Sequence, residues 1–459
     1  MSQPIKASVA LRARALAFSA AVVLLVPAAG SLGAWTQEPA KPAQGKEALP
    51  PKPPPPDEPP PQDGGPIAYH YSTNEAIEFF QARIKKNPQD YVSLRYLGEM
   101  YERKAREAGD PALFERAEAA LRKSLEMFPN SPRAQASLAA VLCSRHKFAE
   151  GLEIARKLVA KDPKDIDALT TLADALMELG RYDEAEVSFK ELYRRFPLPE
   201  VLARLANLAE SRGETEEAKK MMLKAEEQAR QAEGPKAAAW YHARLGDMAF
   251  EAGQIEEAAT LYESVPQGTD PYHDATAGLG RVRAAQGRLE EAIDLYKRAI
   301  AIGPDPQMLV ALGDLYIRAE KPDKAQPLFD QLVQKTKDST EYRRVLAMFY
   351  ADHNRDLSRA LELARLDVAE RQDVHGHDAL AWVLYKNDHA EEAAKSIAEA
   401  LKLGTKDAKI FYHAGLIYLR VGDKDKARQS LQKALDLNPY FSPPQAQHAR
   451  QTVAELDRK

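Results

Sequence analysis

Apolar residues in most of the chain recur at helical spacing within short segments, and polar turns separate these segments. Residues 272–304 show the pattern. Ala292 and Tyr296 lie four residues apart on one face of the second segment, Gly287 separates it from the first segment, and Pro304 follows it. Because glycine readily adopts the left-handed conformation that ends a helix and proline blocks helix continuation, this stretch predicts two helices joined by a tight turn.

The same pair of segments recurs at a nearly constant interval. An alanine or glycine that follows the acidic start of each second segment marks the repeat, and it occurs at Ala117, Gly151, Ala185, Ala218, Ala258, Ala292, Ala325, Ala360, Ala393 and Ala427. Nearly all of these positions are 33 to 35 residues apart. A fixed period of this length indicates a solenoid, since one hairpin cannot bury its apolar face alone and must stack on its neighbours.

The residues that repeat resemble the tetratricopeptide repeat family. One set is Leu172, Ala173, Leu176, Gly180, Ala185, Phe189 and Pro197. The set reappears as Leu245, Gly246, Gly253, Ala258, Tyr262 and Pro266, and again as Gly415, Tyr418, Gly422, Ala427, Leu431, Ala434 and Pro439. The resemblance covers residues 67–459. It implies an all-α, right-handed superhelical solenoid of about ten helix hairpins, with an N-terminal half-repeat and a C-terminal capping helix.

The predicted units follow one another without a gap. We expect a half-unit at 74–88, full units at 89–130, 131–164, 165–198, 199–234, 235–268, 269–304, 305–338, 339–372, 373–405 and 406–440, and a cap at 441–459. Some units depart from the family pattern. The fourth is about six residues longer than the others, the seventh has Pro322 and Pro327 at the start of its second helix, and the eighth lacks the turn glycine.

The first 66 residues differ in character. A basic start containing Lys6, Arg12 and Arg14, an apolar run at 15–26 and small residues behind it predict that residues 1–33 are a signal peptide or a membrane anchor. A third alternative is a terminus without either role. Residues 34–66 are rich in proline and predict a disordered linker, with a ligand for an SH3-type domain as the alternative. These features favour an exported, bacterial-type protein, periplasmic or otherwise extracytoplasmic, either released or held in the inner membrane.

Composition and motifs exclude several functions. The net charge is −4 and no long basic run is present, which disfavours a nucleic-acid partner. The one cysteine, Cys143, excludes an intrachain disulfide framework and a multi-cysteine metal site. His375 and His377 have no third metal ligand in view, and no catalytic motif is present. We therefore expect a protein that is not an enzyme and has no cofactor and no metal.

The resemblance also implies where a protein or peptide partner would bind. In this family the first helix of each hairpin lines the concave groove. The groove candidates are Asp174, Trp240, Asp247, Phe250, Arg281, Asp314 and Arg318 in the middle repeats, and Trp382, Tyr385, Tyr412, Leu416 and Leu419 near the C-terminus. Two alternatives stay open. The C-terminal apolar stripe either packs against the capping helix or anchors a peptide, and the aspartates are either ordinary solvated charge or a site for a basic extended ligand.

The function that these observations favour is a non-catalytic protein–protein interaction scaffold in the cell envelope, which binds an extended peptide or partner in its groove. Two other functions are compatible with the sequence. One is a self-assembling structural component of an envelope complex, and the other is a cytoplasmic regulatory adaptor. The oligomeric state stays open, and any membrane contact would come through the N-terminal segment.

Overall fold

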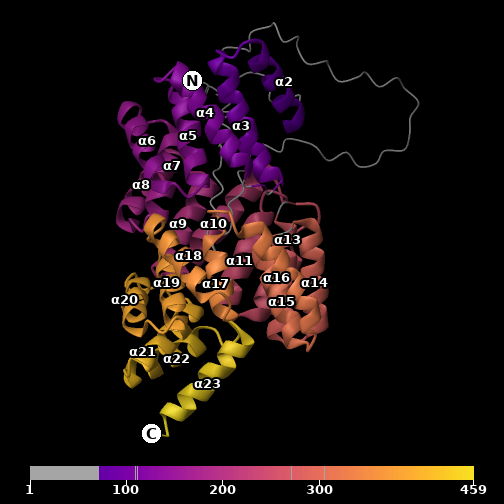
Figure 1. Cartoon of the computed structure of the whole chain (residues 1–459), viewed down its shortest axis with the longest axis vertical. Helices are drawn as coiled ribbons and strands as arrows, with labels where there is room; N and C mark the ends of the chain where they lie inside the picture. Colours follow the sequence, from indigo (N-terminus) through magenta and orange to yellow (C-terminus); the bar gives the residue numbers. More distant parts are fainter. Residues whose placement is uncertain (1–71, 109, 111, 270, 304, 459) are drawn as a thin grey trace, which may run out of the picture.

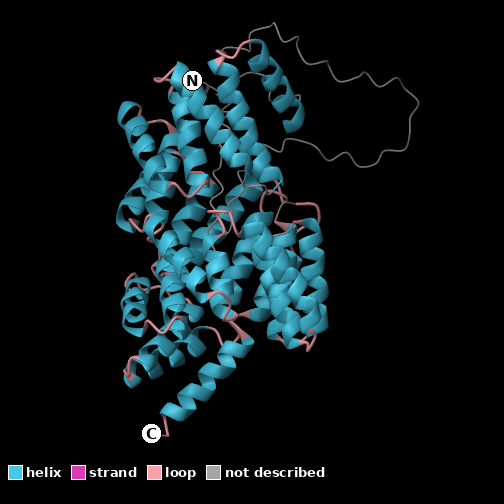
Figure 2. Ribbon diagram, in the orientation of Figure 1, coloured by secondary structure: helices cyan, strands magenta, loops and turns pink. Residues whose placement is uncertain are grey.

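The computed structural model describes residues 72–108, 110, 112–269, 271–303 and 305–458. Within these ranges the chain forms 22 α-helices and no strand (Figures 1 and 2). The predicted signal or anchor at 1–33 and the linker at 34–66 lie outside the described residues. None of the described helices is both long and apolar enough to cross a membrane.

The helices form an N-terminal half-unit, ten hairpins and a C-terminal cap. The half-unit is α2 (Thr73–Lys86) and the cap is α23 (Pro443–Leu456). The hairpins are α3 (Tyr91–Ala108) with α4 (Ala112–Met127), α5 (Pro132–Ser144) with α6 (Phe148–Lys161), α7 (Ile166–Glu178) with α8 (Tyr182–Arg195), α9 (Pro199–Ser211) with α10 (Thr215–Glu233), α11 (Ala239–Glu251) with α12 (Ile255–Glu263), α13 (Tyr272–Ala285) with α14 (Leu289–Ile302), α15 (Pro306–Arg318) with α16 (Pro322–Thr336), α17 (Arg343–Asp352) with α18 (Leu357–Glu370), α19 (Val374–Lys386) with α20 (Ala390–Leu401), and α21 (Ala408–Arg420) with α22 (Lys424–Leu437). The predicted all-α solenoid of helix hairpins is confirmed.

The turn inside a hairpin needs a residue in the left-handed conformation. After α7 this residue is Gly180, with φ 69°, and the next amide, that of Arg181, donates to the carbonyl of Leu176 at 2.9 Å. In the eighth unit, which lacks the glycine, Asn354 takes the left-handed conformation with φ 49°. Asparagine tolerates this conformation better than most residues, so the turn and the repeat survive the substitution.

Small residues let the two helices of a hairpin approach closely. The marker alanines are buried, and a Cβ added to Gly98 or Gly415 would lie 3.1 or 3.2 Å from the carbonyl oxygen of Ala117 or Ala427. The same added Cβ would lie 2.6 Å from Leu121 in the first case, which is far below a normal contact. The family glycine therefore leaves room for the apolar side chain of its partner helix.

The solenoid curves because its first helices approach one another more closely than its second helices do. First helices of successive hairpins pack together at α3–α5, α5–α7, α11–α13, α15–α17, α17–α19 and α19–α21. In the described part of the chain, second helices of successive hairpins do not pack together to this extent. The first helices consequently line the inside of the curve, and the second helices form its outside.

The curve brings the chain back onto itself after between five and six repeats. The hydroxyl of Tyr182 accepts a hydrogen bond from the amide of Val374, 192 residues later, at 2.9 Å. The side chain of Asn438 donates to the carbonyl of Phe250, 188 residues earlier, at 2.8 Å. In Figure 1 the orange helices α18 and α19 reach the magenta helices of the preceding turn. Two successive superhelical turns are therefore in direct contact.

Alanine at position 180 should destabilise the protein more than alanine at position 287. Both glycines have positive φ, 69° and 79°, so each alanine costs about 1 kcal/mol of left-handed strain. A Cβ at Gly287 meets nothing within 4 Å, whereas a Cβ at Gly180 would overlap the carbonyl oxygen of Gln372 in the next superhelical turn. Denaturant unfolding followed by circular dichroism compares the two variants. Equal losses of stability would show that the turns do not touch in solution.

Candidate functional site

The inner surface of the solenoid consists of the side chains that the first helices α7 to α21 direct into the curve. A chain of polar contacts joins each of these helices to the next. The contacts are Asp174–Arg204 at 2.7 Å, Glu210–Arg244, Asp247–Arg281 at 2.6 Å, Ala284 carbonyl–Arg318 at 3.2 Å, Asp314–His353 at 3.1 Å, Asp352–Trp382 at 2.7 Å and Asp378–His413 at 2.8 Å. Most inner acids thus have a partner about one repeat further along the chain.

The three aspartates of the predicted acidic strip have different environments. Asp174 is buried with its partner Arg204, and burial raises the pKa of the carboxyl while the guanidinium opposes this shift. Asp247 accepts hydrogen bonds from the hydroxyl of Tyr262 and from Arg281. Asp314 keeps 48% of its side chain exposed. Among the three, Asp314 therefore offers the most accessible charge.

The two predicted arginines also make internal contacts. The guanidinium of Arg281 lies 4.3 Å from the ring centroid of Phe250 and keeps 34% of its side chain exposed. Arg318 donates to the carbonyl of Ala284. The aromatic candidates of the middle repeats, Trp240 and Phe250, are buried in the core. They therefore stabilise the stacking of the hairpins, and of this group only the charged side chains reach the inner surface.

The C-terminal apolar stripe is largely packed inside the protein. Trp382 lies between the rings of His413 and Tyr385, with centroid distances of 4.2 and 5.2 Å, and its indole N–H donates to Asp352. Trp382 is 5% exposed, whereas Tyr385 is half-buried. Of these two rings, Tyr385 alone presents appreciable surface to a partner.

The cap covers the end of this stripe. The hydroxyl of Tyr412 hydrogen-bonds His448 of α23 at 2.9 Å, and its ring lies 5.7 Å from that of Phe441. Leu416 belongs to the same buried cluster as residues of α23, and Leu419 is half-buried. For Tyr412 and Leu416 the structure thus supports packing against the capping helix over an open anchor site.

The accessible part of the inner surface is centred on α15, α17 and α21. Ile317 is 45% exposed, and the side chain of Lys409 keeps 42% of its surface. Lys409 approaches Asp352 at 3.9 Å. Burial lowers the pKa of Lys409, but Asp352, Asp378, Asp407 and Asp314 raise it further than burial lowers it. This part of the surface can offer an apolar contact beside charges of both signs.

A second group of acids lies on α11 and α13. Burial raises the pKa of Glu251 to about 7; Asp407, which lies on the following superhelical turn, acts in the same direction, and Arg244 opposes it. Burial likewise raises the pKa of Asp274 to about 6, against the effect of His273. These carboxyls take up protons near neutral pH. No group of side chains in the described residues could hold a metal ion.

Known proteins share this pattern. Two family models, both described as tetratricopeptide repeat, match the chain. The first matches residues 142–198 and 283–349, and the second matches residues 103–166, 244–305 and 379–440. Together these matches cover more than half of the chain. The chain belongs to the tetratricopeptide repeat family.

Three curated proteins match parts of this tetratricopeptide repeat protein. A human protein named Protein O-mannosyl-transferase TMTC1 is 25% identical over 37% of this chain and 20% of its own length. A Bos taurus protein named BBSome complex member BBS4 is 27% identical over 36% of this chain and 33% of its own length. An Arabidopsis thaliana protein named Protein CTR9 homolog is 24% identical over 40% of this chain and 17% of its own length. The chain spans at most a third of the length of these relatives.

Two solved structures are also similar to this chain. One is the human IFIT1 dimer with PPP-AAAA, at 16% identity and a TM-score of 0.42, covering 80% of this chain and 86% of that chain. The other is a tetratricopeptide repeat protein from Parabacteroides merdae, at 17% identity and a TM-score of 0.34. The match covers 57% of this chain and 99% of that chain.

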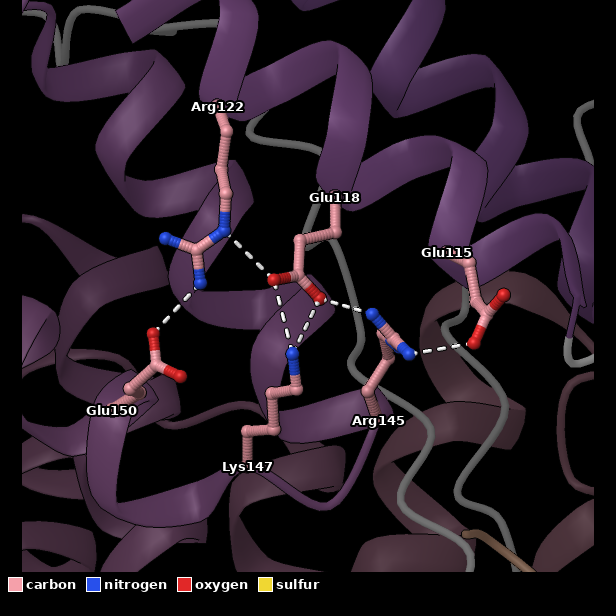
Figure 3. Close-up of polar contacts among 6 residues, drawn as sticks. All are labelled: Glu115, Glu118, Arg122, Arg145, Lys147 and Glu150. Atoms are coloured by element: carbon pink, nitrogen blue, oxygen red, sulfur yellow. Dashed lines mark hydrogen bonds and ion pairs between the residues drawn. The ribbon is translucent and has the colours of Figure 1, made fainter. Parts of the chain in front are cut away.

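The most highly charged cluster of the N-terminal tetratricopeptide repeats lies between two hairpins (Figure 3). Glu118 of α4 accepts hydrogen bonds from Arg122, Arg145 and Lys147, while Arg145 also pairs with Glu115 at 2.7 Å. Burial raises the pKa of Glu118, but the three cations outweigh it and hold the pKa below its usual value.

The same arrangement recurs two repeats later, where Arg212 pairs with Asp183 and Glu186. In both places the cation comes from the turn of one hairpin and the acids come from the start of the preceding second helix. Because the charges pair with one another, the cluster of Figure 3 links neighbouring hairpins and offers little net charge to a ligand.

Sequence reasoning missed the partners that neutralise the inner acids. Arg204, Arg244, His353 and His413 were not among the candidates, although each lies on a first helix or directly after one, 30 to 39 residues after its acid. A search for opposite charges one repeat apart on first helices would have found them. Ile317 and Lys409 share the groove positions of the candidates and are more exposed than most of them.

Replacing Glu251 by glutamine should stabilise the protein above pH 7 and have little effect near pH 4. The folded-state pKa of about 7 exceeds the ordinary value of 4.5, so the folded state binds the proton more tightly than the unfolded state. Stability from this group therefore falls as the pH rises from about 4.5 to 7. Thermal melts at both pH values measure the effect, with Glu391→Gln on the exposed face of α20 as the control. A gain that is the same at both pH values would contradict the assignment.

Proposed function

We propose that this protein is a non-catalytic scaffold that binds an extended segment of another protein along its inner surface. The observation that carries the proposal is the accessible set of side chains on α15 and α21, where Ile317 is exposed one helical turn after Asp314, and Asp314 is one of the acids that raise the pKa of Lys409. An apolar contact with charges of both signs beside it suits a segment in which apolar and charged residues alternate. The internally paired acids elsewhere make a wholly basic ligand a poorer match.

Two further points support a scaffold. Helical repeats occupy the described chain from Thr73 onward, and no catalytic motif stands among them. One relative is named a member of a complex, the BBSome, and the match covers about a third of that protein. Another relative is named a transferase, but the match covers only a fifth of it, so that activity is not carried over to this chain.

Substitutions on the inner surface should weaken peptide binding, and substitutions on the outer surface should not. The probes are fluorescein-labelled twelve-residue peptides in which apolar and charged residues alternate, and fluorescence polarisation with the full chain measures affinity. For the tightest peptide we expect Ile317→Ser and Lys409→Ala each to raise Kd about tenfold, which corresponds to about 1.4 kcal/mol.

The matched controls are Val187→Ser and Lys190→Ala on the outer helix α8, whose side chains are exposed. They should leave Kd unchanged. If inner and outer variants weaken binding equally, the inner surface is not the binding site. If no peptide binds and sedimentation shows concentration-dependent polymers of the wild-type chain, the protein is a self-assembling component and the scaffold proposal is wrong.

We also propose that residues 1–66 direct the solenoid out of the cytoplasm and hold it there or release it. The basic start, the apolar run at 15–26 and the proline-rich stretch support this location. A fusion of residues 1–66 to alkaline phosphatase, which is active only outside the cytoplasm, should be active in a bacterial host. The control is the same fusion with an aspartate pair in place of Val22 and Val23. An inactive parent fusion would favour a cytoplasmic adaptor.

A further inference from the structure

Among the residues that the structure describes, three contacts join the two superhelical turns, and all three involve the loops at hairpin ends. The turn between α7 and α8 meets the loop before α19, the turn between α9 and α10 meets the loop before α21, and the turn between α11 and α12 meets the loop after α22. We call these three contacts the seam. The same parts of the hairpins meet each time, so the seam follows from the superhelix itself.

The first contact contains buried charge. Arg371, which is 2% exposed, pairs with Glu178 across the seam at 2.6 Å and lies 5.7 Å from the ring of Phe148 on the same opposing turn. Arg371 also approaches Asp373 of its own turn at 3.4 Å. An unpaired charge in such a place is costly, so the pair holds together only while both turns are in contact.

The first contact also caps a helix from the opposite turn. Val374 is the first residue of α19, and the amide of a first helical residue has no acceptor within its own helix. The Tyr182 hydroxyl, on α8 of the preceding turn, accepts this hydrogen bond at 2.9 Å. The start of α19 is thus completed by a residue 192 positions earlier in the chain.

The other two contacts are made mainly by backbone. A Cβ on Gly213 would overlap the carbonyl oxygen of Gly404, so the backbones of the two superhelical turns approach there as closely as glycine allows. At the third contact Asn438 is 2% exposed and donates to the carbonyl of Phe250. Each contact is small and includes polar groups, and at the first contact the ring of Tyr182 also packs against the apolar cluster that contains Val374.

The seam therefore differs from the interfaces between neighbouring hairpins. Neighbouring hairpins pack along the length of their helices and bury apolar side chains, as in the clusters around Phe189 and Phe329. In a repeat protein this neighbour packing supplies most of the stability of each unit. Buried ion pairs contribute little net stability, because desolvation offsets their attraction. The seam can consequently separate while every hairpin stays folded.

We propose that the seam is a clasp that opens to admit a ligand to the inner surface. The inner surface presents Ile317 from α15 and Lys409 from α21 while the turns are in contact, and an extended segment reaches this surface more readily once the turns separate. Opening changes the pitch of the superhelix through small rotations between repeats and breaks no helix. The admission step rests on the proposed function, whereas the opening of the seam does not.

Two full-length variants test the opening. Arg371→Glu places like charges beside Glu178, and Tyr182→Phe removes the acceptor of the Val374 amide. We expect Arg371→Glu to increase the maximum dimension measured by small-angle X-ray scattering with unchanged helical content by circular dichroism. We expect Tyr182→Phe to reduce the hydrogen-exchange protection of the Val374 amide at least tenfold.

Matched controls change similar groups away from the seam. Arg365→Glu disrupts an exposed ion pair with Glu392. Tyr193→Phe removes a hydroxyl that accepts a hydrogen bond from Gln228 of the same superhelical turn. Neither should alter the scattering or the exchange at Val374. If Arg371→Glu loses helical content, its scattering no longer tests the opening, and the hydrogen exchange of Val374 in Tyr182→Phe is the test instead. Unchanged scattering with Arg371→Glu, or unchanged protection with Tyr182→Phe, would overturn the clasp.

The admission step has its own readout. With the tightest peptide from the polarisation measurements as the probe, Tyr182→Phe should raise the association rate several-fold, and Tyr193→Phe should leave it unchanged. An unchanged rate in a variant whose seam has opened would show that the seam does not control access. If no peptide binds, the proposed function is wrong. The scattering and hydrogen-exchange results still test whether the seam opens.

Discussion

The close approach of two helices at small residues is the constraint on which this structure depends. Gly98 and Gly415 lie against the backbone of the marker alanines Ala117 and Ala427, and a left-handed residue such as Gly180 turns the chain between the helices. Because similar turns recur in the hairpins from α5 to α22, a small rotation between units accumulates into a superhelix. The close approach of two helices inside one hairpin thereby contributes to the shape of the described chain.

That superhelix is tight enough for one turn to touch the next. The contact brings Glu178 to Arg371 and Tyr182 to Val374, so residues about 190 positions apart share one environment. A solenoid whose units contact only their neighbours has no such long-range contacts. Here they join two superhelical turns directly, while on the inner surface most acids contact a partner one repeat further along.

Much of the fold was predictable from the sequence, and less of the site was. The period of about 34 residues and the turn glycines predict the hairpins, since both are local signals. The pairing of Asp174 with Arg204 depends on how adjacent first helices align, which one segment does not reveal. Trp382 and Tyr412 match groove positions, yet His413 and His448 cover them. The seam depends on superhelical pitch, which sums small rotations that no sequence motif records.

The contact between superhelical turns can be measured directly by the distance between spin labels at Glu214→Cys and Lys406→Cys. Both positions are exposed, they flank the meeting point of Gly213 and Gly404, and the one native cysteine, Cys143, is buried. If the turns meet as in the structure, the distribution of distances is short and narrow. A long and broad distribution would mean that the two superhelical turns do not meet.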